Sequence, residues 1–228
     1  MNATSGEPAN TTGLVRSVCV LHAVRDSGTR RVPITGIDKR PVDEAVHVGV
    51  LGLTGDRQCD TEHHGGRFKA VYVYGDDEAQ RWATELGREL PDGWFGENLR
   101  LCGIATTDAV IGERWRVGDG GLVLEVTGPR TPCGTFGVWS GEPGWVRRFA
   151  ARGDTGAYLK VLAEGPVRAG DRIVVEHVPE HGVTVRDLFT GRDPERIAVM
   201  LEQQDDLSPS VADKARRRVA GQKVKVEY

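Results

Sequence analysis

Short hydrophobic segments rich in β-branched residues recur along residues 13–178, and glycine, proline and aspartate separate them. The segments that predict strands are residues 15–21, 46–50, 70–74, 122–126, 158–162 and 172–178. Several short strands with turn residues between them are typical of an all-β barrel or sandwich. The pattern therefore predicts a mainly β domain over this part of the chain.

Two helices are expected to interrupt the strands. Residues 76–86 carry apolar side chains at helical spacing, and Asp76 is the expected N-cap. Residues 143–151 repeat the pattern, with Trp145 and Phe149 on one side. Both helices would lie at the periphery of the β domain.

The last fifty residues have a different pattern, which predicts three short helices at residues 184–189, 194–203 and 210–220. Thr184 is a suitable cap, Pro194 suits a first turn, and Gly221 suits the position just after a helix. We therefore expect three parts: a disordered leader (1–12), a β-barrel domain (13–178) and a C-terminal three-helix module (179–228) docked on the barrel.

Composition excludes several classes of protein. The 228 residues are 39% hydrophobic and 28% charged, which is enough for one sizeable core. The formal net charge of -3 gives no general attraction to nucleic acid or to an anionic membrane. No apolar run reaches the roughly 18–20 residues that span a bilayer, and residues 1–12 lack the zones of a signal peptide. A cytoplasmic protein is the expectation.

Three clusters of residues could carry chemistry, and the first covers residues 52–69. It combines glycine-containing turns with Arg57, His63, His64 and Lys69. The turns would let backbone N–H groups approach a ligand, and Arg57 and Lys69 could neutralise a phosphate. Adjacent histidines in an extended chain point to opposite faces, which disfavours one metal bound by both. A solvated surface loop is the alternative.

The second cluster is residues 95–99, which read Phe-Gly-Glu-Asn-Leu. The Asn98 amide can both donate and accept hydrogen bonds in one plane, which suits the edge of a heterocycle. The alternative is that Glu97 and Asn98 close a turn through bonds from their side chains to the backbone.

The third cluster is residues 128–134, Gly-Pro-Arg-Thr-Pro-Cys-Gly, directly after a predicted strand. Two prolines stiffen the backbone, and Arg130 puts positive charge near Cys133. A rigid, partly exposed cysteine beside a cation favours a thiolate, which can act as a nucleophile or bind a soft metal. An inert buried cysteine is the alternative.

The other cysteines are Cys19, Cys59 and Cys102, and no spacing among the four indicates a zinc site or a disulfide framework. Cys19 and Cys102 fall in apolar strands and are expected to be structural, whereas Cys59 is ambiguous. Basic residues near the C-terminus are expected to form a solvated face, because no aromatic platform for nucleic acid accompanies them. They are Lys214, Arg216, Arg217, Arg218, Lys223 and Lys225.

Taken together and in order, the motifs resemble the MOSC family and its YiiM-like branch. The matching stretches are Gly52 to Gln58, His64 to Gly66, Phe95 to Leu99, Gly118-Asp119 and Arg130 to Cys133. The segments around Gly156-x-Tyr158 and 165–171 are also similar, as is the Arg-Arg-Arg-Val-Ala-Gly stretch of the tail. The resemblance covers about residues 13–221 and implies a MOSC-type β-barrel with a few peripheral helices.

The resemblance also implies a molybdopterin-type molybdenum cofactor, with Cys133 as the metal ligand and catalytic thiolate. The residues implied to hold the pterin and its phosphate are Arg57, His64, Lys69, Asn98 and Arg130. One position departs from the family, which commonly has an acidic residue before the basic one, where this chain has Phe68 before Lys69.

The implied activity is reduction of N-hydroxylated compounds, such as hydroxylamino nucleobases, to amines. The chain has neither an iron–sulfur cysteine set nor a Gly-x-Gly-x-x-Gly motif for a dinucleotide, so a separate flavin-containing reductase is the expected electron donor. Tryptophans Trp139 and Trp145 are candidates for one wall of the entrance, or for the core. The C-terminal helices could supply a homodimer contact.

Two other functions remain open at this point. Cys133 could carry a persulfide for delivery to another protein, since MOSC domains also occur in cofactor sulfurases. Alternatively, the chain could bind the cofactor without catalysing a reaction.

Overall fold

The computed structural model describes residues 12–30, 32–59 and 65–222. Within these residues, the strands of one sheet close into a barrel. The barrel order is β11-β7-β8-β9-β5-β6-β1, and pairing of β1 with β11 closes it. The bounds are β1 (Thr12–Asp26), β5 (Val71–Gly75), β6 (Leu99–Cys102), β7 (Arg114–Val117), β8 (Leu122–Pro129), β9 (Ala157–Ala163) and β11 (Arg172–His177). The expectation of a mainly β barrel is confirmed.

Strand β1 is longer than the barrel and extends beyond it. Its first residues pair with β11 and β6, whereas Val18 to Asp26 pair with β2 (Ile34–Val42). Irregular register near Ala23 bends this two-stranded arm. A second, small sheet contains β10 (Gly165–Val167), β3 (Val46–Gly49) and β4 (Gly52–Leu53).

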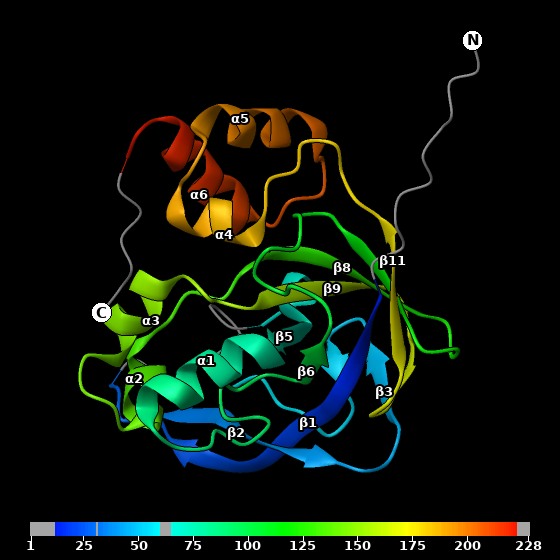
Figure 1. The fold of residues 1–228 in the computed structure, drawn as a ribbon, viewed down its shortest axis with the longest axis vertical. Helices are drawn as coiled ribbons and strands as arrows, with labels where there is room; N and C mark the ends of the chain where they lie inside the picture. Colours follow the sequence, from blue (N-terminus) through cyan, green and yellow to red (C-terminus); the bar gives the residue numbers. More distant parts are fainter. Residues whose placement is uncertain (1–11, 31, 60–64, 223–228) are drawn as a thin grey trace.

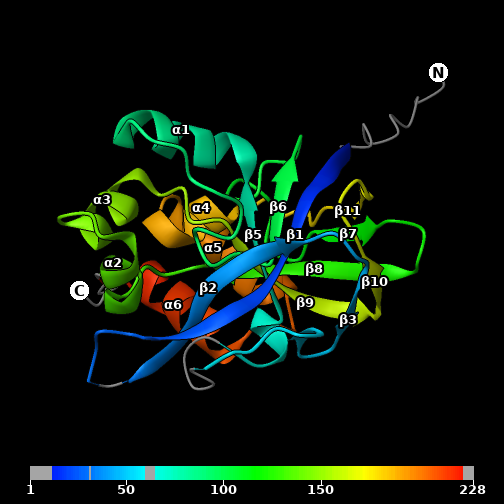
Figure 2. The same cartoon turned by 90° about the horizontal axis from the view of Figure 1, so that it is seen from below.

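Helices lie in two groups outside the barrel (Figure 1). The first group is α1 (Asp76–Leu86), α2 (Gly134–Ser140) and α3 (Trp145–Arg152); the second is α4 (Val185–Thr190), α5 (Pro194–Gln203) and α6 (Pro209–Val219). The two groups lie against different parts of the barrel, as the view from below also shows (Figure 2). Among the described helices, none has the length and apolarity needed to cross a membrane.

The buried side chains form two clusters. The larger fills the barrel and continues into the C-terminal helices, because Val185, Ile197 and Val211 belong to it. The smaller lies outside the barrel under α1–α3, and we call it the aromatic cluster: Ile37, Tyr72, Tyr74, Ala79, Trp82, Trp94, Phe95, Phe136, Trp145 and Phe149. Its rings pack at centroid distances such as 4.0 Å between Tyr74 and Phe95. The few aromatic residues of the chain are therefore concentrated beside the barrel.

All six strands predicted from the sequence are present, and so are the five predicted helices. Helix α1 begins at Asp76 as expected, but the N-cap is Gly75, so the prediction for Asp76 as the cap is wrong. The carboxylates of Asp76, Asp77 and Glu78 instead lie in the first turn of α1, where negative charge interacts favourably with the helix dipole. Thr184 caps α4 by accepting a hydrogen bond from the N–H of Asp187, as predicted.

Helix α2 was not predicted, because its sequence Gly-Thr-Phe-Gly-Val-Trp-Ser has low helix propensity. Burial of Phe136 in the aromatic cluster stabilises it. Strand β2 was also missed, since Gly36 and Pro41 interrupt its pattern. Gly36 is needed there: a Cβ would lie 2.5 Å from the carbonyl oxygen of Arg57.

The C-terminal helices pack closely on the barrel. A Cβ on Gly128 of β8 would lie 2.8 Å from Val211 of α6, so the glycine lets the helix approach the strand. Thr12 already belongs to β1, and residues 1–11 lie outside the described residues. The division into leader, barrel and helical module stays a prediction.

The expected solvated basic face is wrong for two of its members. Lys214 is half-buried and its Nζ lies 3.1 Å from the hydroxyl of Thr131, in the loop that carries Cys133. Arg218 is also half-buried, and it donates to the carbonyl of Phe189. Residues 223–228 lie outside the described residues. Contacts with a loop 83 residues away in the chain, which no local pattern encodes, remove Lys214 from the surface.

Candidate functional site

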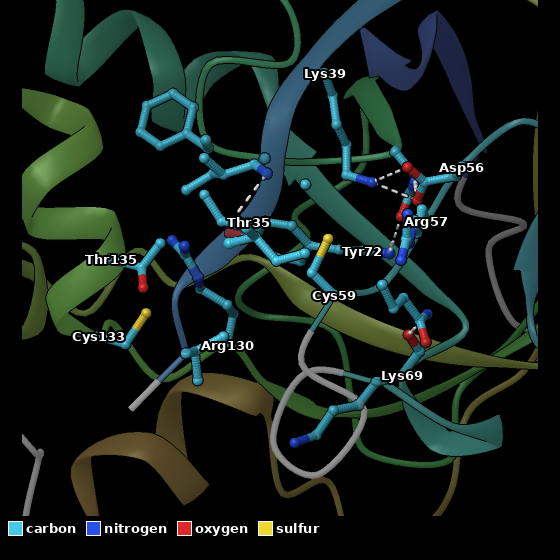
Figure 3. A pocket seen from close by; sticks show the side chains of 18 of the residues that line it. Thr35, Lys39, Asp56, Arg57, Cys59, Lys69, Tyr72, Arg130, Cys133 and Thr135 are labelled. Carbon is cyan, nitrogen blue, oxygen red and sulfur yellow. Dashed lines mark hydrogen bonds and ion pairs between the residues drawn. The ribbon is translucent and has the colours of Figure 1, made fainter. Parts of the chain in front are cut away.

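A cavity of about 350 Å³ opens where the arm of β1 and β2 passes the aromatic cluster. Strand β2 forms one wall and the segments 56–59 and 95–98 form others. Residues 130–135, which run from the end of the loop after β8 into the first turn of α2, complete the cavity. Figure 3 shows Cys133, Arg130 and Thr135 on one side, Lys39, Asp56 and Arg57 on the other, and Cys59 between them. Its size lies in the usual range for a small-molecule site.

The structure brings together residues that the sequence analysis selected from three separate motifs. The predicted site residues that line the cavity are Arg57, Lys69, Asn98, Arg130 and Cys133. The remaining one, His64, lies outside the described residues. Their roles toward a cofactor stay predictions, but their convergence on one cavity is a property of the fold.

Cys133 is placed by the start of α2. It is the N-cap residue of that helix, with extended backbone, and its carbonyl oxygen accepts a hydrogen bond of 3.1 Å from the N–H of Gly137. The side chain is half-buried against the aromatic cluster and its sulfur faces the cavity (Figure 3). The thiol is therefore held on a rigid element and is still accessible.

Arg130 is the most unusual group of the cavity. Its side chain is 5% exposed, and the guanidinium carbon lies 3.7 Å from the ring centroid of Phe136. Its Nη1 is buried without a hydrogen-bond partner. Within the described residues, the guanidinium lies against the rings of Tyr72 and Phe136 and not against a carboxylate. A buried guanidinium without a counter-charge is costly unless an anion binds to it. The position therefore favours an anionic ligand.

The Asn98 amide is occupied by the protein itself. Its Oδ1 accepts a 3.1 Å hydrogen bond from the N–H of Tyr72, and its Nδ2 donates to Asp56 at 2.8 Å and to the carbonyl of Cys19 at 3.4 Å. These bonds tie β5, β1 and the segment after β4 together. Asn98 thus shapes the cavity by joining separate strands rather than by closing a local turn, and its role toward a cofactor stays a prediction.

Sequence reasoning missed the ion pair on the opposite side of the cavity. Lys39 of β2 donates to both oxygens of Asp56, and the side chains are 9% and 7% exposed. Asp56 belongs to a motif that was singled out, but nothing in the local sequence around Lys39 indicates a site. Only the pairing of β2 with β1 brings this lysine to the cavity.

Gln58 fixes the segment that carries Lys69. Its Nε2 donates to the carbonyl of Lys69 at 3.0 Å, and its Oε1 accepts from the N–H of Gly66 at 3.2 Å. The ammonium of Lys69 lies 5.6 Å from the ring centroid of Tyr158, which also lines the cavity. Phe68, the residue that departs from the family pattern, contacts the guanidinium of Arg67 at 4.4 Å.

Neither tryptophan proposed for the entrance lines the cavity. Trp145 is 1% exposed in the aromatic cluster, and Trp139 packs against that cluster while its Nε1 donates to the carbonyl of Trp94 at 2.7 Å. The entrance wall on this side is formed by Gly134 and Thr135. The alternative prediction, that both tryptophans pack in the core, is therefore confirmed.

Of the other cysteines, Cys19 is fully buried, and this burial raises the pKa of its thiol to about 12. It is therefore an inert core residue, as expected. Cys59 lines the cavity, which resolves the ambiguity of its position. Cys102 is half-buried at the end of β6 and lies outside the cavity lining.

The charges of the cavity are unbalanced. Among the described lining residues, one is anionic, Asp56, and four are cationic: Lys39, Arg57, Lys69 and Arg130. Within the same part of the chain, no group of three or more histidine, cysteine and carboxylate side chains is arranged to hold a metal ion. The cavity can thus offer the thiols of Cys59 and Cys133 and several cations to one ligand.

Comparisons with known proteins place this arrangement in a family. The family model described as "MOSC domain" matches residues 60–174. The protein YflK of Bacillus subtilis is 36% identical over 152 residues, covering 67% of this chain and 68% of that protein. A protein named "Reductase" from Gibberella moniliformis is 32% identical over 143 residues, covering 61% of this chain and 25% of that protein.

The protein YiiM of Escherichia coli is 28% identical over 154 residues, covering 61% of this chain and 65% of that protein. The fold is shared with the crystal structure of YiiM from Geobacillus stearothermophilus, with a TM-score of 0.73 and 23% identity. That likeness covers 91% of this chain and 99% of the Geobacillus chain. The barrel and the C-terminal helices therefore both have counterparts in a solved structure.

Proposed function

Because the chain belongs to the MOSC domain family, we propose that its cavity binds a molybdopterin-type molybdenum cofactor and that the protein reduces N-hydroxylated compounds to amines. The observation that carries the proposal is that one cavity is lined both by an accessible thiol, Cys133, and by the buried guanidinium of Arg130, whose Nη1 has no hydrogen-bond partner. The relative named "Reductase" supports an oxidoreductase.

The residues present fit such a cofactor. A molybdopterin-type cofactor brings its own sulfur ligands, so a single protein thiolate suffices, and Cys133 offers one of the soft ligands that such a metal accepts. The phosphate of the cofactor needs cations and N–H donors, which Arg130, Lys69 and Arg57 supply at the cavity wall. The Nη1 of Arg130, which is buried without a hydrogen-bond partner, is the group that most favours an anion at this wall.

When bound, the cofactor supplies two-electron chemistry: R–NH–OH takes up two electrons and two protons and leaves as R–NH₂ and water. The chain's own groups would bind and orient the cofactor and shield it from water. The α2 N-terminus fixes Cys133, whereas Tyr72, Phe95 and Tyr158 cover the cavity walls with apolar surface and limit the access of water. The electrons would come from a separate flavin-containing reductase.

The test is analysis of metal and pterin in protein purified from a host that makes the cofactor. We expect about one molybdenum and one pterin per chain in the wild type, and loss of the metal in Cys133→Ala. Cys102→Ala is the matched control, since Cys102 is half-buried but lies outside the cavity lining. It should keep the metal.

Reduction is then measured with a hydroxylamino purine and a flavin-containing reductase. Wild-type protein without molybdenum but with cyanide-labile sulfur on Cys133 would overturn the proposal in favour of a persulfide carrier. Wild-type protein that holds molybdenum but reduces no N-hydroxylated compound with a competent donor would reduce the proposal to cofactor binding alone.

A further inference from the structure

Two buried arginines of the described chain are supported in different ways. Arg100 is 1% exposed, and its Nη2 and Nε donate to Oε1 of Glu97 at 2.5 Å and 2.8 Å. Arg130 is 5% exposed, and its guanidinium lies against aromatic rings instead. The guanidinium carbon is 3.7 Å from the ring centroid of Phe136 and 5.5 Å from that of Tyr72. One guanidinium is thus held by a carboxylate and the other by rings.

The two kinds of support leave different parts of the guanidinium available. Its five N–H donors point outward in the plane of the group, and a carboxylate binds to them there. An aromatic ring instead attracts the cation over the face of the ring and occupies no N–H donor. Arg130 fits the second case, because its Nη1 is buried and has no hydrogen-bond partner. Its donor edge can therefore serve a ligand in the cavity that it lines (Figure 3).

Phe136 provides the closest of these rings and is itself fixed by packing. Its side chain is 0% exposed. Its ring centroid lies 5.1 Å from that of Phe149, 5.5 Å from that of Trp145 and 6.0 Å from that of Trp94. Because these rings surround it, Phe136 keeps its place against Arg130 before any ligand binds.

The same side chain also anchors the helix that carries the candidate metal ligand. Cys133 is the N-cap of α2, and Phe136 lies in the first turn of that helix. Phe136 and Ser140 are the buried residues of α2. Phe136 therefore sets the thiol of Cys133 and the guanidinium of Arg130 in a fixed relation to each other.

We propose that Phe136 is a positioning residue for the cavity: its ring holds the Arg130 guanidinium by the face and leaves the N–H edge open to a phosphate group. A carboxylate in the place of the ring would also hold the arginine, but it would compete with an anionic ligand for the same donors. The inference rests on the proposed function in one respect, since the phosphate is taken to be that of the pterin cofactor.

The first experiment uses inorganic phosphate and the full chain made in a host that cannot synthesise the cofactor. Isothermal titration calorimetry should show saturable phosphate binding by the wild type. Phe136→Leu should bind phosphate at least about fivefold more weakly, because leucine fills much of the same apolar space but offers no aromatic face to the cation. Wild-type protein without saturable phosphate binding overturns the inference, and so does a smaller loss in Phe136→Leu.

Phe149→Leu is the matched control for a general loosening of the aromatic cluster. Phe149 is also 0% exposed in the same cluster, but its ring centroid lies 5.8 Å from the guanidinium carbon of Arg130. Both leucine variants should melt at a lower temperature in circular dichroism, and Phe149→Leu should keep its phosphate affinity within about twofold of the wild type, because the cation–π attraction is weak at that distance. An equal loss of affinity in the two variants overturns the inference.

A second background shows whether Phe136 acts through Arg130. Arg130→Lys keeps a positive charge but has no planar group to lie against the ring. In the Arg130→Lys background, Phe136→Leu should therefore change phosphate affinity by less than about twofold. The same loss in both backgrounds means that Phe136 has only a structural role, which overturns the inference.

The last experiment identifies the source of the phosphate. Wild type, Phe136→Leu and Phe149→Leu from a cofactor-competent host are dialysed, and the retained pterin is measured after oxidation by its fluorescence. We expect Phe136→Leu to lose pterin at least about fivefold faster than the other two proteins. Equal retention in Phe136→Leu overturns the inference and leaves the proposed function intact. Absence of pterin from the wild type overturns the proposed function, even if inorganic phosphate binds as expected.

Discussion

Replacing Arg100 by methionine should be strongly destabilising, because Arg100 is the counter-charge of a buried carboxylate. Arg100 and Glu97 are 1% and 0% exposed, and the Nη2 and Nε atoms of Arg100 lie 2.5 Å and 2.8 Å from Oε1 of Glu97. That same oxygen accepts the N–H of Gly93 at 2.9 Å. Methionine fills a similar volume but leaves the Glu97 charge uncompensated in the interior.

Breaking a buried pair from one side costs about 3–5 kcal/mol, whereas an exposed ion pair contributes at most about 1 kcal/mol. Arg16→Met is the matched control: Arg16 contacts Asp76 and Asp92 at 3.2 Å, but its side chain is 47% exposed. Arg100 contacts the same two carboxylates at 3.6 Å. The difference between the two variants therefore reports the buried contacts that only Arg100 makes, chiefly the bond to Glu97.

The assay is urea unfolding followed by circular dichroism, with thermal melting in parallel. We expect Arg100→Met to lower the free energy of unfolding by about 3–5 kcal/mol, or Tm by roughly 10 °C, and Arg16→Met to lower it by less than about 1 kcal/mol. The double variant Glu97→Gln/Arg100→Met should recover at least half of the loss, because no charge is then buried. If Arg100→Met costs no more than Arg16→Met, the reasoning is refuted.

Two further predictions concern titratable side chains. Burial lowers the pKa of Lys214 from 10.5 to about 8 in the folded protein. Between these pH values the unfolded chain therefore binds more protons than the folded chain. The free energy of unfolding of the cofactor-free protein should then rise from about pH 8 to pH 10.5. The rise attributable to Lys214 is at most on the order of 3 kcal/mol and should be absent from Lys214→Met in urea melts; an identical pH profile in the variant would contradict it. Cys19, buried with a thiol pKa raised to about 12, should resist iodoacetamide at pH 8 in the folded protein, while the accessible thiol of Cys133 is alkylated. Peptide mass spectrometry measures both, and labelling of Cys19 at the rate of Cys133 would be inconsistent with this packing.

Much of the fold could be predicted because its signals are local. The alternation of β-branched segments predicted six of the strands, and helices α1 and α5 were predicted at their observed bounds, since helical periodicity and end signals lie within one segment. The partial exposure of the Cys133 thiol could also be predicted, because two prolines and an arginine lie within six residues of it. Helix α2 escaped prediction, because only packing of Phe136 compensates for its glycines.

The sequence by itself determined which residues have suitable chemistry: a thiol in a stiff loop, cations in turns and an amide in a motif. Only the tertiary structure decided what each of them does. It paired Lys39 with Asp56, used the Asn98 amide within the protein, and left the Nη1 of Arg130 without a hydrogen-bond partner. It also brought Lys214 to Thr131 across 83 residues. The physical reason is that hydrogen bonding, desolvation and charge repulsion depend on distance in space, which the spacing of residues along the chain does not specify.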